Sequence, residues 1–306
     1  MLRKILFILF FIFYINNCLS QYLVNLEYID NRFIADSLYK SQKYENALPF
    51  YIKIVESDFH RRLDYMYIAK CFYETNNYQD AKKYLQLAVE KGAHFNSIED
   101  TIYCYDTTSY TVLNYLAIKE FENYRSQLIE NTKSYFSNNE INELLSKELI
   151  LRIELEQKLL EIKTKYPEID SIEIQLNNIK IENQIALNSE IEKNGFPTIK
   201  TVGEKAVYAA FTIVQHSDHN VIFQEKCLEL MLEEYKNGEI PAVCIAYLQD
   251  RILINKGEKQ IFGTQTVEKK NKIIRKLTID SELIEKRRTV MMLNKPNLYL
   301  TDFVNM

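Results

Sequence analysis

Two stretches in the first third of the chain repeat each other at a spacing of 34 residues. Each stretch carries two runs of apolar side chains at helical spacing, which predicts two helices joined by a turn. One such unit cannot bury its apolar face alone, so neighbouring units must stack on each other. The matching positions are Tyr44, Ala47, Phe50, Val55 and Glu56 with Tyr78, Ala81, Tyr84, Val89 and Glu90, and Ile34, Ala35 and Leu38 with Ile68, Ala69 and Phe72.

The segments KYENALPFYIKIVE and NYQDAKKYLQLAVEKG lie one period apart and resemble the tetratricopeptide repeat family over residues 31–93. The helices of each hairpin should approach closely at alanines, with turns near Gln42-Lys43 and Asn76-Asn77. Residues 95–136 are expected to cap the array as a divergent third unit. The resemblance implies a concave surface for a protein or peptide partner, and a scaffold that serves only for packing is an equal alternative.

The first twenty residues have the three-part composition of a secretory signal peptide. Arg3 and Lys4 precede an apolar run over residues 5–15, and cleavage after Ser20 places small side chains at the −3 and −1 positions. The apolar run is too short to span a bilayer comfortably. We therefore expect an extracytoplasmic protein, periplasmic or secreted, without a stable membrane anchor after cleavage. Lipid attachment at Cys18 is the alternative.

Charge and cysteine content argue against several classes of function. The 38 basic and 42 acidic residues give a formal charge of −4, which supplies no field suited to nucleic acid or an anionic membrane. The spacing of Cys71, Cys104, Cys227 and Cys244 fits no metal site, so neither a metal nor a cofactor is predicted. Cys227 with Cys244 and Cys71 with Cys104 are the simplest disulfide pairs, and four buried thiols are the alternative.

The second half of the chain divides into a charged helical stretch and a unit rich in turns. Residues 141–192 predict two long helices interrupted at Tyr166-Pro167. Five of the six glycines follow between Gly195 and Gly263, where the backbone needs tight turns. We expect a signal peptide over residues 1–20, a repeat domain over 21–136 and an α-rich domain over 137–306. The apolar side of the first long helix is predicted to consist of Leu144, Leu145, Ile150, Leu151, Leu155, Leu159 and Ile162, and that of the second of Ile172, Leu176, Ile179, Ile181 and Ile185.

The unit rich in turns is expected to combine helices with a small antiparallel β-hairpin or sheet. Dense apolar patterns predict helices over residues 202–214, 221–236 and after Pro241. Residues 251–255 and 259–265 flank Lys256-Gly257-Glu258 and are predicted to pair as the hairpin, with residues 273–279 as a further strand. The predicted fold class is mainly α.

Several spaced polar motifs resemble those of an uncharacterised bacterial domain family of unknown function. The motifs are GFPT, QHSD, AYLQDR and GEKQIFGTQ, followed by DSELIEKRR and LNKPNLYL, and the resemblance covers residues 144–300. It implies domain identity and no assigned reaction. Phe262 stands where tyrosine is usual, and Glu156-Gln157 lacks the arginine that usually follows nearby.

The polar residues of these motifs form a candidate site. A histidine that exchanges protons, a carboxylate that orients it and an arginine that binds an anion would permit acid/base hydrolysis. No established catalytic motif accompanies them. Candidate catalytic residues are His216, Asp218 and Asp250; candidate ligand-binding residues are Gln215, Arg251, Gln260, Thr264 and Gln265, with Glu156 behind them.

Each residue of this candidate site also has a structural interpretation. His216 and Asp218 could cap helices, and Asp250 with Arg251 could form an ion pair. The residues Gln260, Thr264 and Gln265 could satisfy exposed backbone groups. The sequence therefore favours an exported scaffold or binding protein that holds a protein or peptide on its repeats and a small anionic ligand in its C-terminal domain. The alternative is a hydrolase-like enzyme using His216, Asp218 or Asp250, and Arg251.

Overall fold

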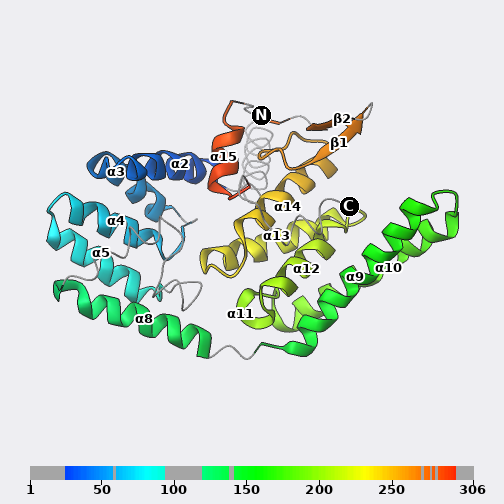
Figure 1. Cartoon of the computed structure of the whole chain (residues 1–306), viewed down its shortest axis with the longest axis horizontal. Helices are drawn as coiled ribbons and strands as arrows, with labels where there is room; N and C mark the ends of the chain where they lie inside the picture. Colours follow the sequence, from blue (N-terminus) through cyan, green and yellow to red (C-terminus); the bar gives the residue numbers. More distant parts are fainter. Residues whose placement is uncertain are drawn as a thin grey trace, which may run out of the picture.

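The computed structural model describes residues 25–57, 60–93, 119–137, 141–269, 272–275, 278–279 and 282–293. The protein is mainly helical, as predicted, and its helices form two groups (Figure 1). The N-terminal array contains α2 (Leu26–Lys40), α3 (Tyr44–Glu56), α4 (Asp64–Glu74), α5 (Tyr78–Glu90), the 3₁₀ helix η2 (Lys119–Phe121) and α8 (Glu122–Ser137). The C-terminal domain contains α9 (Glu143–Lys165), α10 (Asp170–Asn194), α11 (Ile199–Val202), α12 (Glu204–Gln215), α13 (Val221–Lys236), α14 (Ala242–Asn255), β1 (Thr266–Lys269), β2 (Lys272–Arg275) and α15 (Ile284–Val290).

The N-terminal array consists of two stacked helical hairpins, α2 with α3 and α4 with α5. Helices α3 and α5 begin and end at equivalent positions of the 34-residue repeat. The turn residues Gln42 and Asn76 are also equivalent, and both have positive φ, at 57° and 59°. The four repeat alanines, Ala35, Ala47, Ala69 and Ala81, are fully buried where the helices meet. Membership of the tetratricopeptide family stays a prediction.

Helix α8 packs against α5 and covers that end of the array. Helix α8 and η2 are the described part of the predicted third unit, of which residues 95–118 lie outside the described ranges. The two turn tyrosines of the repeats differ in their surroundings. Tyr44 packs edge-on against Tyr39 at 5.4 Å between ring centroids, whereas Tyr78 is 47% exposed beside Tyr73.

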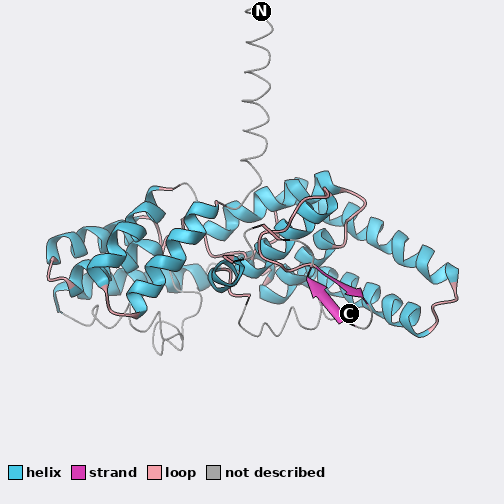
Figure 2. Cartoon of the chain, turned by 90° about the horizontal axis from the view of Figure 1, so that it is seen from above, coloured by secondary structure: helices cyan, strands magenta, loops and turns pink. Residues whose placement is uncertain are grey.

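Helices α9 and α10 form a long antiparallel hairpin that projects from the rest of the domain (Figure 2). The predicted interruption is confirmed, because α9 ends at Lys165 and α10 begins at Asp170. The predicted apolar side of α9 is covered only in part, since Leu145 and Ile150 pack against the core. Leu144 is 80% exposed and Leu151 is 52% exposed, whereas Leu149, Ile153 and Glu156 are buried. Because α9 packs on both α10 and α12, the positions of two neighbours decide which side is covered.

The second long helix departs from its predicted face in the same way. Ile172 and Leu176 are buried as expected, but Ile181 and Ile185 are exposed and the polar Asn183 between them is buried. The short helix α12 is the centre of the domain. Its residues from Ala206 to Gln215 are all buried, and it contacts α9, α10, α13 and α14.

The β-hairpin predicted over residues 251–265 is wrong, because residues 251–255 are the last part of helix α14. Gly257, with φ 76°, ends this helix: its N–H donates to Ile254 O at 3.0 Å, and Glu258 N–H donates to Leu253 O at 2.8 Å. This is the Schellman arrangement of a helix C-terminus, for which glycine is as suitable as for a hairpin turn. In the described residues one short antiparallel pair occurs instead, with Thr266 opposite Arg275 and Lys269 opposite Lys272.

The thiols of Cys71, Cys227 and Cys244 are free and buried, so the predicted Cys227–Cys244 disulfide is wrong. Burial raises the pKa of Cys71 and of Cys227 to about 12, which makes both thiols unreactive at neutral pH. Cys104 lies outside the described residues, as does the predicted signal peptide with Cys18. No helix within the described ranges is long and apolar enough to cross a membrane.

Helix α15 joins the two groups of helices, because it belongs to the C-terminal part of the chain but packs on α2 of the N-terminal array (Figure 1). Its Arg287 is 2% exposed, and the Nε of this arginine lies 3.8 Å from Oδ1 of Asp30 on α2. The N-terminal array and the C-terminal domain therefore share a seam, along which side chains from both groups meet.

Candidate functional site

Three of the sequence motifs meet at the guanidinium of Arg251 on helix α14. Its Nε donates to Asp218 Oδ1 at 2.8 Å, a second nitrogen bonds the other carboxylate oxygen, and Nη1 donates to Gln265 Oε1 at 3.1 Å. Asn255, one turn further along α14, also donates to Asp218 Oδ1 at 2.8 Å. Burial acts to raise the pKa of Asp218, but hydrogen bonds from Arg251 and Asn255 outweigh it and lower the pKa. The pair is held rigidly, although both side chains reach solvent.

Asp250, the neighbour of Arg251, has a different role. Its buried carboxylate accepts hydrogen bonds from the backbone N–H groups of Ile261 (2.7 Å), Phe262 (3.0 Å) and Thr264 (2.9 Å), and from Thr264 Oγ1 (2.9 Å). Burial raises the pKa of Asp250, and these hydrogen bonds offset the rise only in part. The predicted Asp250–Arg251 ion pair is therefore wrong, because Asp250 is engaged by the loop that follows α14.

Gln260 and Gln215 also take part in the hydrogen bonds of the folded domain, Gln260 through its side chain and Gln215 through its backbone carbonyl. Gln260 is fully buried, and its side chain bonds both backbone groups of Gln265, accepting from N–H at 2.8 Å and donating to O at 3.0 Å. Gln215 is buried at the end of α12, and its backbone carbonyl accepts from Gln224 Nε2 at 3.3 Å. Gln260 therefore satisfies backbone groups as expected, and so does Gln265, whose Nε2 donates to Tyr247 O at 3.4 Å, whereas Thr264 Oγ1 donates to the carboxylate of Asp250.

His216 points to a different neighbour from Asp218, although only Ser217 separates them. Its Nδ1 lies 2.7 Å from Oε1 of Glu156 on α9, whose side chain is 5% exposed. Asn183 of α10 donates to the other oxygen of Glu156 at 3.4 Å. The ring of His216 is partly exposed, and its Nε2 has no hydrogen-bond partner among the described residues. A buried carboxylate therefore orients a histidine whose second nitrogen is free, which is the arrangement of an acid/base pair.

The structure thus divides the predicted site into two clusters. Asp218, Arg251 and Gln265 form one, and His216 with Glu156 forms the other; no hydrogen bond between the two clusters is seen in the described residues. The acidic partner of His216 is Glu156, which the sequence placed behind the site, and not Asp218 or Asp250. This follows from the direction of α9, which no local pattern in the sequence reports.

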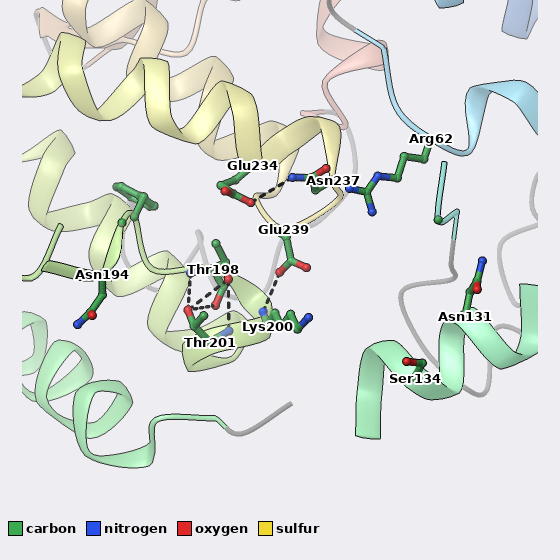
Figure 3. A pocket seen from close by; sticks show the side chains of 13 residues that line it. Arg62, Asn131, Ser134, Asn194, Thr198, Lys200, Thr201, Glu234, Asn237 and Glu239 are labelled. Atoms are coloured by element: carbon green, nitrogen blue, oxygen red, sulfur yellow. Dashed lines mark hydrogen bonds between the residues drawn. The ribbon is translucent and has the colours of Figure 1, made fainter. Parts of the chain in front are cut away.

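A cavity of about 490 Å³ lies in the seam between the N-terminal array and the C-terminal domain (Figure 3). We call it the seam cavity. Arg62, Asn131 and Ser134 approach it from the array, and the GFPT turn with residues of the α13–α14 connection forms the opposite side. The lining residues are Arg62, Gly92, Asn131, Ser134, Asn194, Gly195, Phe196, Thr198, Lys200, Thr201, Glu234, Asn237 and Glu239.

The GFPT motif builds one wall of the seam cavity. Gly195 ends α10 with φ 82°, Phe196 is buried, and Thr198 caps α11 by accepting from Thr201 N–H at 3.3 Å. Glu239 fixes this wall to the α13–α14 connection, since its Oε2 accepts from Lys200 N–H at 2.7 Å. The GFPT motif therefore shapes the wall of the seam cavity that lies opposite the repeats.

Several residues of the network and the cavity were not predicted. Asn255 follows Arg251 by one helical turn, so its spacing could have indicated a shared partner. Gln224 and Arg288 lie in helices with several other charged or polar residues, so their positions did not distinguish them; Arg288 donates to Phe262 O at 3.1 Å. Arg62 and Glu239 carried no signal, because they approach the cavity from distant parts of the chain.

Residues 144–300, just over half of the chain, match a family described as "Family of unknown function (DUF6624)". The chain belongs to the DUF6624 family. This confirms an uncharacterised domain in the C-terminal half, and the DUF6624 match begins within α9, so it includes both clusters and the GFPT wall of the seam cavity. Comparison with curated proteins and with solved structures finds no match.

Proposed function

We propose that the protein is an exported binding protein that holds a polar ligand in the seam cavity, between its helical hairpins and its DUF6624 domain. The observation that carries this proposal is a cavity of about 490 Å³ whose walls come from both groups of helices. Ligand pockets commonly lie between domains, where two rigid bodies supply converging polar groups. The export and the tetratricopeptide character of the hairpins are part of the proposal.

The residues that line the seam cavity favour a ligand that carries one positive and one negative charge, or a ligand without charge. Two cationic side chains, Arg62 and Lys200, face two carboxylates, Glu234 and Glu239, and the other polar groups are amides and hydroxyls. A chain of amide groups with one amino and one carboxyl end matches such a lining, because amides both donate and accept. We therefore propose a short peptide as the ligand class.

Binding of trialanine to the full chain, measured by calorimetry, tests this proposal. We expect binding to the unaltered protein and at least about tenfold weaker binding to Arg62→Gln, since one charge-assisted hydrogen bond is worth about 1.5–3 kcal/mol. Lys82→Gln is the control, because Lys82 is an exposed lysine of α5 that does not line the cavity. Equal binding by Arg62→Gln, or no binding of trialanine, would contradict the proposal.

A second function is favoured by the Glu156–His216 pair. We propose that His216 Nε2 takes a proton from a water that attacks an ester or amide bond, while Glu156 stabilises the resulting imidazolium through Nδ1–H. General acid/base catalysis of this kind contributes about 10²–10⁴-fold in rate.

Hydrolysis of p-nitrophenyl acetate by the full chain tests the second function. We expect His216→Gln to lose at least about 10²-fold in kcat with the fold intact by circular dichroism, and Glu156→Gln to lose less. His219→Gln is the matched control, because His219 is a nearby exposed histidine that contacts Gln184 at 3.2 Å. Similar rates for all three variants would show that His216 is structural.

A further inference from the structure

A second cavity, of about 310 Å³, lies where helix α2, the start of α4, helix α13 and the end of α15 meet. We call it the tyrosine cavity, because three tyrosines line it. It shares no lining residue with the seam cavity. The residues around it are Tyr28, Arg32, Phe33, Asp36, Ser37, Lys40, Arg61, Tyr67, Tyr235, Ala242, Thr289, Val290 and Met292.

Arg61 is the unusual residue of this cavity. Its Nε is buried and has no hydrogen-bond partner within the part of the chain that the structure describes. Its backbone N–H donates to Asp64 Oδ2 at 2.8 Å, but no ion pair within 4.0 Å joins its guanidinium to a described carboxylate. The guanidinium of Arg61 therefore offers the cavity a positive charge and one unsatisfied nitrogen, which an anion bound there would satisfy.

The neighbouring Arg32, which also lines the tyrosine cavity, differs from Arg61 in that its guanidinium is bonded to carboxylates. Its Nε donates to Asp36 at 3.0 Å, and its Nη1 bonds the fully buried Asp64. Asp36 also accepts from Tyr51 OH at 2.8 Å. Both carboxylates near the tyrosine cavity are therefore already hydrogen-bonded by other groups, and neither forms an ion pair with Arg61, although the charge of Asp64 helps to raise the pKa of Arg61.

The charges around the tyrosine cavity set the charge of a fitting ligand. The cavity is lined by three cationic residues and one carboxylate, which are Arg32, Lys40, Arg61 and Asp36. Asp64, which pairs with Arg32, supplies a second negative charge, so the net charge is +1. A ligand with a single negative charge balances this sum. A guanidinium binds a carboxylate through two parallel hydrogen bonds, and a carboxylate carries one charge at neutral pH.

The rest of the lining favours a ligand with an apolar body. Tyr28, Tyr67 and Tyr235 are nearly buried and present ring surface, and Phe33, Ala242 and Val290 add apolar contact. Burial raises the pKa of Tyr28 and of Tyr67, so both phenols stay protonated. A cavity of about 310 Å³ is at the small end for organic ligands, which suits a body the size of one aromatic ring.

We propose that the tyrosine cavity binds a small organic carboxylate with an apolar body, and that Arg61 binds its carboxylate group. The site is independent of the proposed function, since it uses none of the residues that line the seam cavity. It assigns the anion-binding role to the boundary of the repeats, and not to Arg251, whose guanidinium is engaged by Asp218 and Gln265.

Calorimetric titration of the full chain with benzoate tests this site. We expect benzoate to bind the unaltered protein saturably at millimolar concentration and to bind Arg61→Gln about thirtyfold more weakly. The neutral analogue benzyl alcohol should bind the unaltered protein more weakly than benzoate does. Arg62→Gln is the matched control, because it removes the adjacent arginine, which lines the other cavity. Benzoate binding that Arg61→Gln leaves unchanged, or no benzoate binding to the unaltered protein, would overturn the proposal. So would inorganic phosphate binding more tightly than benzoate.

A second variant guards against loss of binding through misfolding. Arg61→Met keeps the length of the side chain and removes its charge; because no ion pair or side-chain hydrogen bond with a described residue is lost, we expect a Tm without ligand close to that of the unaltered protein. Benzoate should then raise the Tm of the unaltered protein and leave that of Arg61→Met unchanged. A lower Tm for Arg61→Met combined with an undiminished benzoate shift would show that Arg61 serves the fold only.

Discussion

The polar side chains inside the DUF6624 domain and the arginines at its seam with the repeats differ in whether they have partners. Inside the domain, Asp250 accepts four hydrogen bonds at 3.0 Å or less, and Arg251 is bonded to Asp218 and Gln265. At the seam, neither Arg61 nor Arg62 forms a side-chain hydrogen bond or ion pair with another described residue. The polar motifs inside the domain hold the fold together, whereas the two seam arginines have side-chain nitrogens without partners among the described residues, and the proposed ligand sites rest on this difference.

This difference changes how the motifs of the family are interpreted. A polar residue in a motif attracts attention as a possible catalytic or binding group, but Asp250, Gln260 and Gln224 are buried and fully engaged. Buried polar groups are almost always hydrogen-bonded, so these residues need no ligand to explain their burial. His216 differs from them, because one of its ring nitrogens has no partner among the described residues.

The largest effect is expected from Asp250→Ala. This change leaves the buried N–H groups of Ile261, Phe262 and Thr264 without an acceptor, and we expect a loss of about 3–5 kcal/mol in the free energy of unfolding. Urea unfolding monitored by circular dichroism measures it. The control Glu258→Ala, on the exposed side of the same loop, should change stability by less than about 0.5 kcal/mol. Equal effects would remove the structural role assigned to Asp250.

Gln224→Leu should have the next largest effect. Gln224 is fully buried, and its amide donates to Val214 O at 3.1 Å and to Gln215 O at 3.3 Å, which satisfies the end of α12. Leucine keeps the volume and removes these bonds, so we expect a loss of about 2 kcal/mol in urea unfolding. Ile222→Ala, at a position 80% exposed on the same helix, is the control and should be near neutral. A neutral Gln224→Leu would show that these carbonyls need no donor.

Asp218→Asn should have a smaller effect that depends on pH. The side chains of Asp218 and Arg251 are partly exposed, so solvent screening limits the pair to about 0.5–1 kcal/mol at pH 7. Since the pKa of Asp218 is lowered in the folded state, its contribution is present above the unfolded pKa of about 4 and is lost as the pH falls through the folded pKa. The difference in unfolding free energy between the unaltered protein and Asp218→Asn should therefore shrink between pH 7 and pH 3. A difference that grows on acidification would contradict this account.

The smallest effect on stability is expected from Arg62→Gln. No partner for the guanidinium of Arg62 occurs within the described ranges, so its removal should change the free energy of unfolding by less than about 0.5 kcal/mol. The comparison that matters is with Arg251→Gln, which breaks bonds to Asp218 and Gln265 and should cost more. If thermal unfolding ranked Arg62→Gln as the more destabilising of the two, the distinction between seam and domain would fail.

The sequence predicted the helical elements more reliably than their surroundings. The period of the repeat located α3 and α5, and the proline after Tyr166 located the end of α9. Gly257 was misinterpreted, because a glycine after an apolar run suits a hairpin turn and a helix C-terminus equally. The exposed face of α9 was also misjudged, since periodicity shows that a helix has an apolar side but not how many neighbours cover it.

The sequence predicted which residues belong to the candidate site, but it did not predict which of them bond to each other. Spacing indicated that the QHSD, AYLQDR and FGTQ motifs belong together, and Arg251 does join them. It could not show that Asp250 would turn toward the loop while Arg251 turned toward Asp218, because adjacent helical residues point about 100° apart. Nor could it show that Glu156, 60 positions before His216, would be the partner of that histidine.

The amino-acid sequence by itself determined the stacked helical hairpins, the long charged helices and the positions of the polar motifs, because each depends on residues within one or two turns of each other. The tertiary structure alone decided which polar groups obtained partners. Arg61 and Arg62 are adjacent in the chain, yet they line two different cavities, one against α13 and α15 and the other against the GFPT turn. A partner supplied by a distant segment depends on how whole helices pack, and that information is not local.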